Sequence, residues 1–244
     1  DELSHGCVCM SRLAQRSREA ELMEIVPGEP GEVDRTLREL ETINRWTLAY
    51  RPTLRWLDRV VQAGDRPRLS VLDVACGHGD MLRRIARWAE RRGVTVELTG
   101  VDRDPDAIQS AMAATPPGAA IRYEVRDVFA MPEDERWDVI VSSLFAHHLF
   151  DDALPRFLLW MHGTARTSWL VNDLHRHPIP YHVVRIGTRL AGFGRFVVHD
   201  APVSVARGFT REEWRAILAQ AGIDAESVEI HWWMPFRYSV GCLK

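Results

Sequence analysis

The chain has 244 residues, 46% of them hydrophobic and 27% charged, a balance typical of folded globular proteins. Its formal net charge of -3 argues against a surface that binds nucleic acid by neutralising phosphates. No apolar run approaches the ~18 residues that a membrane-spanning helix needs, and the N-terminus lacks the basic-then-apolar order of a signal peptide. We therefore expect neither a nucleic-acid partner nor a membrane span.

The cysteines do not predict a disulfide framework. They are Cys7, Cys9, Cys76 and Cys242. The first two are too few and too close together for a metal-binding knuckle, and the other two lie in a glycine turn and in a terminal apolar strand. This usage favours a reducing, cytoplasmic compartment. Residues 1–10 are expected to be a disordered or expression-derived extension outside the fold.

Residues 11–66 are expected to form an N-terminal helical cap. A polar helix is predicted over 11–24, and a cluster of proline and glycine then breaks the chain at 27–31. Apolar positions spaced like one helix face predict a second helix over 33–49 and a third over 52–61.

From residue 69 onward, short apolar strands alternate with helices, which predicts βαβ units and a mostly parallel sheet. The expected strands are 69–74, 94–101, 121–125, 137–142 and 168–173. Asp104 and Asp151 are predicted N-caps, and Thr210 with Glu213 has the spacing of a capping box on a helix that ends at Gly222. Two final strands, 228–232 and 236–242, are joined by too short a link for a parallel crossover, so this pair is expected to be antiparallel.

The strongest chemical motif is the segment VLDVACGHGD over residues 71–80, an apolar strand followed by an acid and a glycine turn. Gly77 and Gly79 permit positive φ and remove side-chain bulk, so a ligand can lie against the backbone at the end of the strand. A dinucleotide site is the competing interpretation. It requires a small residue where this chain has Leu82, which disfavours NAD.

Two further acids follow the next strands. Asp102 ends the second strand and can accept hydrogen bonds from ribose hydroxyls, since Asp104 already serves as the helix cap. Asp127 follows the third strand. Its carboxylate and the backbone N–H of Val128 could read an adenine edge, although an acid in such a loop is often only a turn residue.

In this order, the three motifs resemble those of the class I S-adenosylmethionine-dependent methyltransferases. The resemblance implies a Rossmann-like, seven-stranded α/β sheet over residues 67–244, mostly parallel with an antiparallel last strand. It also implies S-adenosylmethionine as cofactor and S-adenosylhomocysteine as product. The implied cofactor-binding residues are Asp73, Ala75, Gly77, Gly79, Asp102, Arg103, Asp127, Val128 and Ser142. Ala75 departs from the family pattern, which usually has its first glycine there.

The fourth strand ends in the sequence SSLFAHHL, and the family places this strand end beside the reactive methyl group. The paired His147 and His148 are similar to the small-molecule branch that includes ubiquinone- and menaquinone-type enzymes. They do not match the Asn-Pro-Pro-Tyr ending of nitrogen-methylating nucleic-acid enzymes. One of these histidines could be a base, or both could simply order the loop.

The fifth strand ends near Asp173 and His175, which could form a base and its orienting acid or could be a cap and a solvated side chain. His148, His175 and His147 are therefore the candidate catalytic residues. A site with three histidine ligands from these positions is conceivable, but no matching carboxylate spacing supports it and no metal is expected. Residues 174–208, rich in aromatic residues and glycine, are expected to form a mobile substrate lid.

The sequence thus predicts methyl transfer to a small-molecule acceptor, most simply a hydroxyl of an aromatic, phenolic or polyketide-type compound. SSLFAHHL and NDLHRHPIPY are similar to segments of bacterial methyltransferases encoded near type III polyketide synthases, an analogy that suggests secondary metabolism. Carbon methylation in quinone biosynthesis, an NAD-type dehydrogenase and a non-catalytic cofactor-binding protein remain as alternatives.

Overall fold

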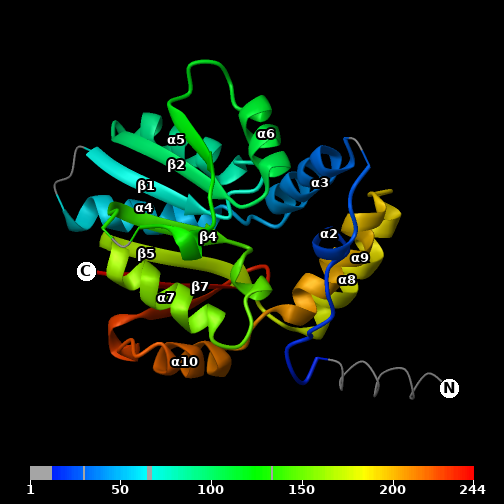
Figure 1. Ribbon diagram of the computed structural model, residues 1–244. Helices are drawn as coiled ribbons and strands as arrows, with labels where there is room; N and C mark the ends of the chain where they lie inside the picture. Colours follow the sequence, from blue (N-terminus) through cyan, green and yellow to red (C-terminus); the bar gives the residue numbers. More distant parts are fainter. Residues whose placement is uncertain (1–12, 30, 65–67, 133) are drawn as a thin grey trace.

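The computed structural model describes residues 13–29, 31–64, 68–132 and 134–244. A seven-stranded sheet with the order β3-β2-β1-β4-β5-β7-β6 forms its centre (Figure 1). The first five strands are parallel, β7 is antiparallel to β5, and β6 is antiparallel to β7. The expected α/β architecture with a reversed strand at its end is therefore confirmed.

The strands are β1 (Arg68–Val74), β2 (Thr95–Asp102), β3 (Ile121–Val125), β4 (Trp137–Ser143), β5 (Ala165–Leu174), β6 (Glu229–Trp233) and β7 (Arg237–Leu243). The α-helices are α2 (Leu22–Ile25), α3 (Glu32–Trp46), α4 (Arg51–Ala63), α5 (Asp80–Arg92), α6 (Pro105–Ala114), α7 (Ala153–Thr164), α8 (Pro178–Leu190), α9 (Arg195–Arg207) and α10 (Arg211–Gln220). Three short 3-10 helices are η1 (Val128–Ala130), η2 (Ala146–His148) and η3 (Ala225–Ser227).

The alternating side chains of the strands build one apolar core on each face of the sheet. On β1, Leu69 and Val71 belong to the core under α4, α5 and α6, whereas Leu72 and Val74 belong to the core under α7 and α10. Both faces are covered, which is why the central strands are nearly continuous apolar runs in the sequence.

The helix caps were partly predicted. Asp104 caps α6 by accepting from the N–H of Asp106, and Thr210 with Glu213 forms the capping box of α10. Asp151 is not the cap of α7. That helix starts after Asp152, and Asp151 instead pairs with Arg18. Asp151 thus forms an ion pair with a distant segment and not a local helix cap.

The N-terminal segment differs from the expected polar helix. Within the described residues, the only α-helical turn before residue 26 is α2, and residues 16–21 run as irregular chain across the molecule. The backbone N–H of Ser17 donates to the carbonyl of Ala206 on α9 at 3.0 Å. Tertiary contacts therefore replace local helix formation there. The expectations for residues 1–10, including Cys7 and Cys9, lie outside the described residues.

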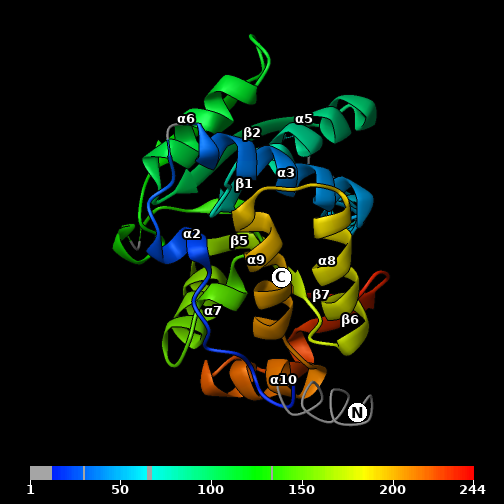
Figure 2. The ribbon, with the colours of Figure 1, turned by 90° about the vertical axis from the view of Figure 1, so that its right-hand side faces the viewer.

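A layer of helices covers the carboxyl edge of the parallel strands. Figures 1 and 2 show α8 and α9 lying side by side there, with α2 against α9 and α3 across the neighbouring strand ends. The expected lid segment thus consists of two helices. Among the described residues, no helix is both long and apolar enough to cross a bilayer.

Candidate functional site

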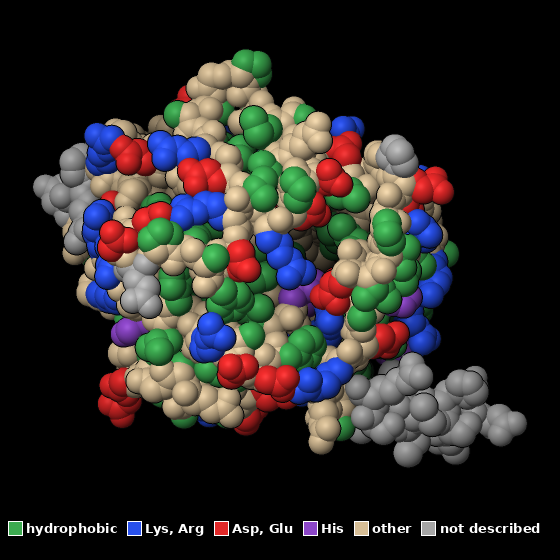
Figure 3. Space-filling view, in the orientation of Figure 1, with side chains coloured by type: hydrophobic (Ala, Val, Ile, Leu, Met, Phe, Trp, Pro, Cys, Tyr) green, Lys and Arg blue, Asp and Glu red, His purple; other side chains and the backbone are tan. Residues whose placement is uncertain are grey.

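A cavity of about 400 Å³ lies between this helical layer and the strand ends. It is lined by residues after β1 and β4, by α3, by α8 and α9, and by the start of β7. Figure 3 shows the surface hollowed between the sheet and the α2, α8 and α9 layer. Ligands of open α/β sheets bind at this edge, so we take the cavity as the candidate active site.

The glycine turn after β1 forms one wall of the cavity. Ala75, Gly77 and Gly79 all have positive φ, at 56°, 50° and 71°. A Cβ added at Gly77 would meet only Leu37, at 4.0 Å, so the backbone of this residue faces space that a ligand can fill. Gly79 is packed differently, because a Cβ there would lie 2.4 Å from the hydroxyl of Tyr123. Gly77 thus offers open backbone, and Gly79 allows close packing.

Asp102 supports this turn from the end of β2. One carboxylate oxygen accepts from the N–H of Gly77 and the other from the N–H of Asp104, each at 3.0 Å. Burial raises the pKa of Asp102, and these two N–H bonds oppose that shift. Each oxygen keeps a free lone pair, so the expected hydrogen bonds to a ribose are compatible with this geometry. The neighbouring Arg103 is exposed.

The expected adenine pair lies at the end of β3. Asp127 is exposed and accepts from the N–H of Phe129, which makes it the cap of η1, while Val128 is buried in the core. The Asp127 carboxylate thus acts as a turn residue, which was one of the two roles considered from the sequence. Its second oxygen is available to a ligand.

A carboxylate cluster lies beneath the glycine turn. Asp73 is fully buried, and burial together with Asp80 and Asp102 raises its pKa well above the usual range. Asp80 accepts from the Tyr50 hydroxyl at 2.6 Å and from the Asn44 amide at 3.4 Å. Three acids in one place favour a cationic ligand, and S-adenosylmethionine carries a sulfonium and an ammonium group. The donors and charges of this site therefore fit that cofactor.

Ser142 faces away from this cavity. Its hydroxyl donates to the backbone carbonyl of Val74 at 3.1 Å, and its side chain is buried between β4 and β1. The next residues, Ser143 and Leu144, line the cavity instead. The alternation of side chains along a strand explains this shift of one position.

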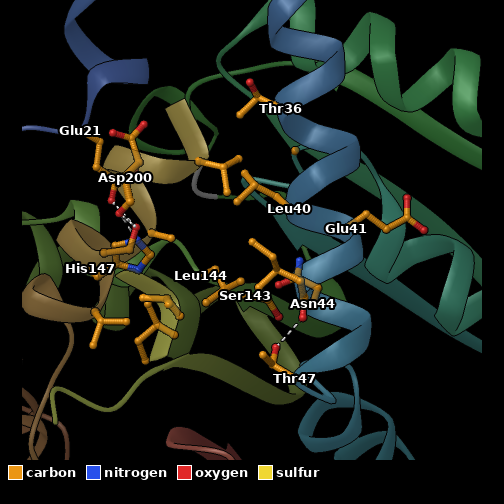
Figure 4. A pocket seen from close by; sticks show the side chains of 18 of the residues that line it. Glu21, Thr36, Leu40, Glu41, Asn44, Thr47, Ser143, Leu144, His147 and Asp200 are labelled. Carbon is orange, nitrogen blue, oxygen red and sulfur yellow. Dashed lines mark hydrogen bonds and ion pairs between the residues drawn. The ribbon is translucent and has the colours of Figure 1, made fainter. Parts of the chain in front are cut away.

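His147 is buried in an acidic environment. Its Nδ1 lies 2.8 Å from Oδ1 of Asp173, and its Nε2 lies 3.6 Å from Oε1 of Glu21. Figure 4 shows His147, Glu21 and Asp200 on one side of the cavity, with Leu40 and Asn44 of α3 and the following Thr47 on the other. Burial lowers the pKa of His147, but the two carboxylates outweigh burial and hold it at about 9.

His148 lies beside His147, with the two ring centroids 4.2 Å apart. Its Nδ1 lies 2.7 Å from Oε1 of Glu24, and its Nε2 lies 3.9 Å from Oε2 of Glu21. Arg207 binds both carboxylate oxygens of Glu24, at 2.7 and 2.9 Å. Both candidate histidines, which lie on η2 after β4, therefore line the cavity and share Glu21 as a carboxylate neighbour.

His175 is separated from these two histidines. Its Nδ1 accepts from the indole N–H of Trp232 at 3.2 Å, and its ring stacks on Phe236. It is not among the residues that line the cavity, and Asp173 bonds His147 in its place. The expected pair of Asp173 with His175 is therefore not formed, and neither is the set of three histidines. Burial lowers the pKa of His175 to about 4, helped by the charges of His177 and Arg176.

Arg237 places a buried cation in the cavity wall. Only 3% of it is exposed, and its Nη2 donates to the hydroxyl of Thr47 at 3.1 Å. Its Nε and Nη1 have no hydrogen-bond partner in the described part of the chain. Burial lowers the pKa of Arg237 to about 10, against the opposing charges of Asp173 and Tyr50, so it stays protonated at neutral pH.

The central segment of the chain also matches a known protein family. Residues 71–167 match the family model described as a methyltransferase domain. This segment is a methyltransferase domain. The match covers the glycine turn, Asp102, Asp127 and both histidines of η2. Together with the solved methyltransferase structures that contain S-adenosylhomocysteine, it supports S-adenosylmethionine as the cofactor, as the sequence predicted. Among curated proteins, no sequence matches the chain.

Solved structures of methyltransferases share the whole fold at low sequence identity. The plantazolicin methyltransferase BpumL in complex with S-adenosylhomocysteine superposes with a TM-score of 0.63 and 15% identity, over 88% of this chain and 96% of that chain. Magnesium protoporphyrin IX methyltransferase from Synechocystis PCC 6803 gives a TM-score of 0.55 and 14% identity, over 99% and 95%. The CMeT domain of the citrinin polyketide synthase gives 0.53 and 16%, over 72% and 46%.

Several residues of the site were not found by sequence reasoning. Asp80 directly follows the glycine motif and could have been noticed there. Glu21 and Glu24 lie in a polar segment with no motif, and Arg237 begins a strand that reads as apolar. Their roles come from tertiary packing, which the order of residues along the chain does not reveal.

Proposed function

We propose that this methyltransferase transfers a methyl group to an acidic hydroxyl of a small, largely apolar acceptor, such as a phenol or an enol of polyketide type. The observation that carries this proposal is the single cavity that joins Gly77 to Arg237. It places the cofactor turn and a buried cation with free donors in one enclosed space.

The wall of the cavity indicates the size and polarity of the acceptor. Apolar side chains from α3, α8 and α9, including Leu40, Val183 and Phe196, surround it. A space of this volume suits a drug-sized molecule and not a polymer. An apolar acceptor with one ionisable oxygen would match these walls and also supply the missing partner of Arg237.

The protein would contribute to the reaction mainly by aligning the acceptor oxygen with the methyl group of the cofactor. When bound, S-adenosylmethionine supplies a methyl group that is already activated as a sulfonium. Gly77, Asp102 and Asp80 would hold it in place. Arg237 would stabilise the ionised acceptor oxygen, and the His147–His148 end of the cavity would orient that oxygen toward the methyl carbon. With the cofactor bound, the ionised acceptor oxygen beside Arg237 would thus be aligned to receive the methyl group that the cofactor supplies.

The neighbours and the local sequence support the small-molecule part of the proposal by analogy. The structural relatives include a plantazolicin methyltransferase and a domain of a polyketide synthase. The segments after β4 and β5 are similar to those of methyltransferases encoded near type III polyketide synthases. The two helices α8 and α9 would then serve as the substrate lid.

The test is a turnover assay with methyl-labelled S-adenosylmethionine and a panel of hydroxylated aromatics, alkylresorcinols, alkylpyrones and quinol precursors. We expect a labelled methyl ether on one class of acidic hydroxyl, identified by mass spectrometry. A carbon-methylated product would support the quinone-type alternative. Tight cofactor binding without transfer to any member would overturn the acceptor proposal.

A further inference from the structure

Glu21, His147 and His148 bring three metal-ligating groups together at the cavity. One ligand atom from each lies within 4.8 Å of the others. The Nε2 atoms of the two histidines lie 3.6 and 3.9 Å from the carboxylate oxygens of Glu21. These separations are too long for hydrogen bonds, yet both rings point the same nitrogen at the same carboxylate.

The separations suit a shared ion. Two atoms that each bind a tetrahedral ion at about 2.0–2.2 Å lie about 3.3–3.6 Å apart. The Nε2 of His147 already has this spacing to Oε1 of Glu21, and the Nε2 of His148 lies slightly farther from the other oxygen, Oε2. All three ligand atoms lie within 4.8 Å of one another, so small side-chain shifts would bring them around one ion. Two histidines and one glutamate form a known set of zinc ligands that leaves a fourth position open.

The outer hydrogen bonds have the pattern of a metal centre. The Nδ1 of His147 lies 2.8 Å from Asp173, and the Nδ1 of His148 lies 2.7 Å from Glu24. Metal-binding histidines almost always donate their other ring N–H to a carboxylate or carbonyl group. A bound dication would take the place of a proton on each Nε2, while each Nδ1 would keep its proton toward Asp173 or Glu24.

The charge of the cluster suits a dication. Its contacts contain three carboxylates, Glu21, Glu24 and Asp173, and one guanidinium, Arg207. With both rings neutral, as they would be in the metal-bound form, two negative charges remain within this set of contacts, while Arg16 and Arg237 interact with Asp173 from outside it. Arg207 binds Glu24 at 2.7 and 2.9 Å and lies 3.5 Å from Oε1 of Glu21, so its charge balances Glu24 more than Glu21.

We propose that Glu21, His147 and His148 bind a divalent transition-metal ion of the zinc type, with its open position toward the acceptor end of the cavity. This proposal departs from the sequence-based expectation that the chain binds no metal. The role of the ion toward the acceptor rests on the proposed function, because a Lewis acid beside an acidic hydroxyl would favour its ionised form. Binding of the ion does not depend on that function.

The test measures metal binding directly. The full chain would carry Cys7→Ser and Cys9→Ser in every variant, since free thiols also bind zinc. After chelator treatment, Zn²⁺ affinity would be measured by competition with a chromogenic chelator, and Co²⁺ would report the ligand geometry through its visible absorption. We expect one ion per chain. Glu21→Gln and His148→Ala should weaken Zn²⁺ binding at least ~100-fold, and Glu24→Gln about 10- to 100-fold.

His231→Ala is the matched control, because His231 is exposed on β6. It should leave metal affinity unchanged. Thermal unfolding of every variant without metal would show that the fold is retained, and Glu21→Gln keeps an acceptor for the hydroxyl of Ser204. Equal Zn²⁺ affinity of the parent and Glu21→Gln, or absence of stoichiometric binding, would overturn the proposal.

The two proposals fail in different ways. Full methyl transfer by metal-stripped protein would overturn the metal role and leave the methyltransferase proposal standing. Stoichiometric, Glu21-dependent Zn²⁺ binding without transfer to any acceptor would support the metal site and overturn the acceptor class.

Discussion

Asp173 at the end of β5 bonds Nδ1 of His147 across the sheet edge, at 2.8 Å, and not His175, two residues further along its own chain. The same carboxylate also accepts from the backbone N–H of His147 at 3.2 Å. It thereby fixes both the ring and the backbone of η2. The ends of neighbouring parallel strands meet here, so the acid of one strand orients the histidine of the next.

Because Asp173 bonds His147 and not His175, we expect alanine substitutions of the three histidines to affect turnover differently. We expect His147→Ala and His148→Ala to lower turnover by about 100-fold or more, since groups that position or ionise the acceptor typically contribute that much. His175→Ala should keep turnover close to that of the parent, because its ring lies outside the cavity. Initial rates at saturating cofactor check this. A large loss only in His175→Ala would contradict the assignment.

The sheet could be predicted from sequence because its signals are local. Apolar runs bounded by glycine and acidic turns mark each strand, and the β5 prediction missed only the first three and the last residue of Ala165–Leu174. The glycine motif after β1 likewise indicated a ligand site, because a backbone that must approach a ligand constrains residue type at adjacent positions. The cofactor itself was implied only by the family resemblance of the three motifs together.

The acceptor end of the site could not be predicted in the same way. Glu21 meets His147 only because the N-terminal segment crosses α9, where Asp200 accepts from the backbone N–H groups of Leu22 and Met23. This pairing depends on long-range packing and leaves no periodic trace in the sequence. The expected polar helix over 11–24 was wrong for the same reason, since tertiary contacts override weak helix propensity.

Asp102→Asn should weaken cofactor binding about 10- to 100-fold, because a charged acceptor of ribose hydroxyls is lost. Isothermal titration with S-adenosylhomocysteine measures this. Asp106→Asn is the matched control, since Asp106 is exposed in the first turn of α6 and faces no cavity. Equal weakening in both variants would point to damage of α6 and not to ribose recognition.

Ala75→Gly should raise the stability of the fold. Ala75 has a φ of 56°, a left-handed conformation that costs a residue with a side chain about 1–2 kcal/mol. The greater unfolded-state freedom of glycine offsets about 0.5–1 kcal/mol, so we expect a net gain of up to about 1 kcal/mol in the free energy of unfolding. Ala219→Gly, on an exposed turn of α10, should have the opposite sign. Urea unfolding of both variants compares them, and destabilisation by Ala75→Gly would show that the methyl group contributes packing that outweighs the strain.

Arg237→Met should raise the KM for an acidic acceptor about 10- to 100-fold, because a hydrogen bond to a charged group contributes about 1.5–3 kcal/mol. Cofactor affinity should not change, since Arg237 donates to Thr47 and not to the expected cofactor residues Gly77, Asp80 or Asp102. Arg237→Lys keeps the charge but lacks the planar fork, and we expect an intermediate KM. The methylated product supplies the internal comparison. It has no ionisable hydroxyl, so its inhibition constant should be nearly the same in all three proteins. If product and acceptor lost affinity equally, Arg237 would act by shaping the cavity and not by binding the reacting oxygen.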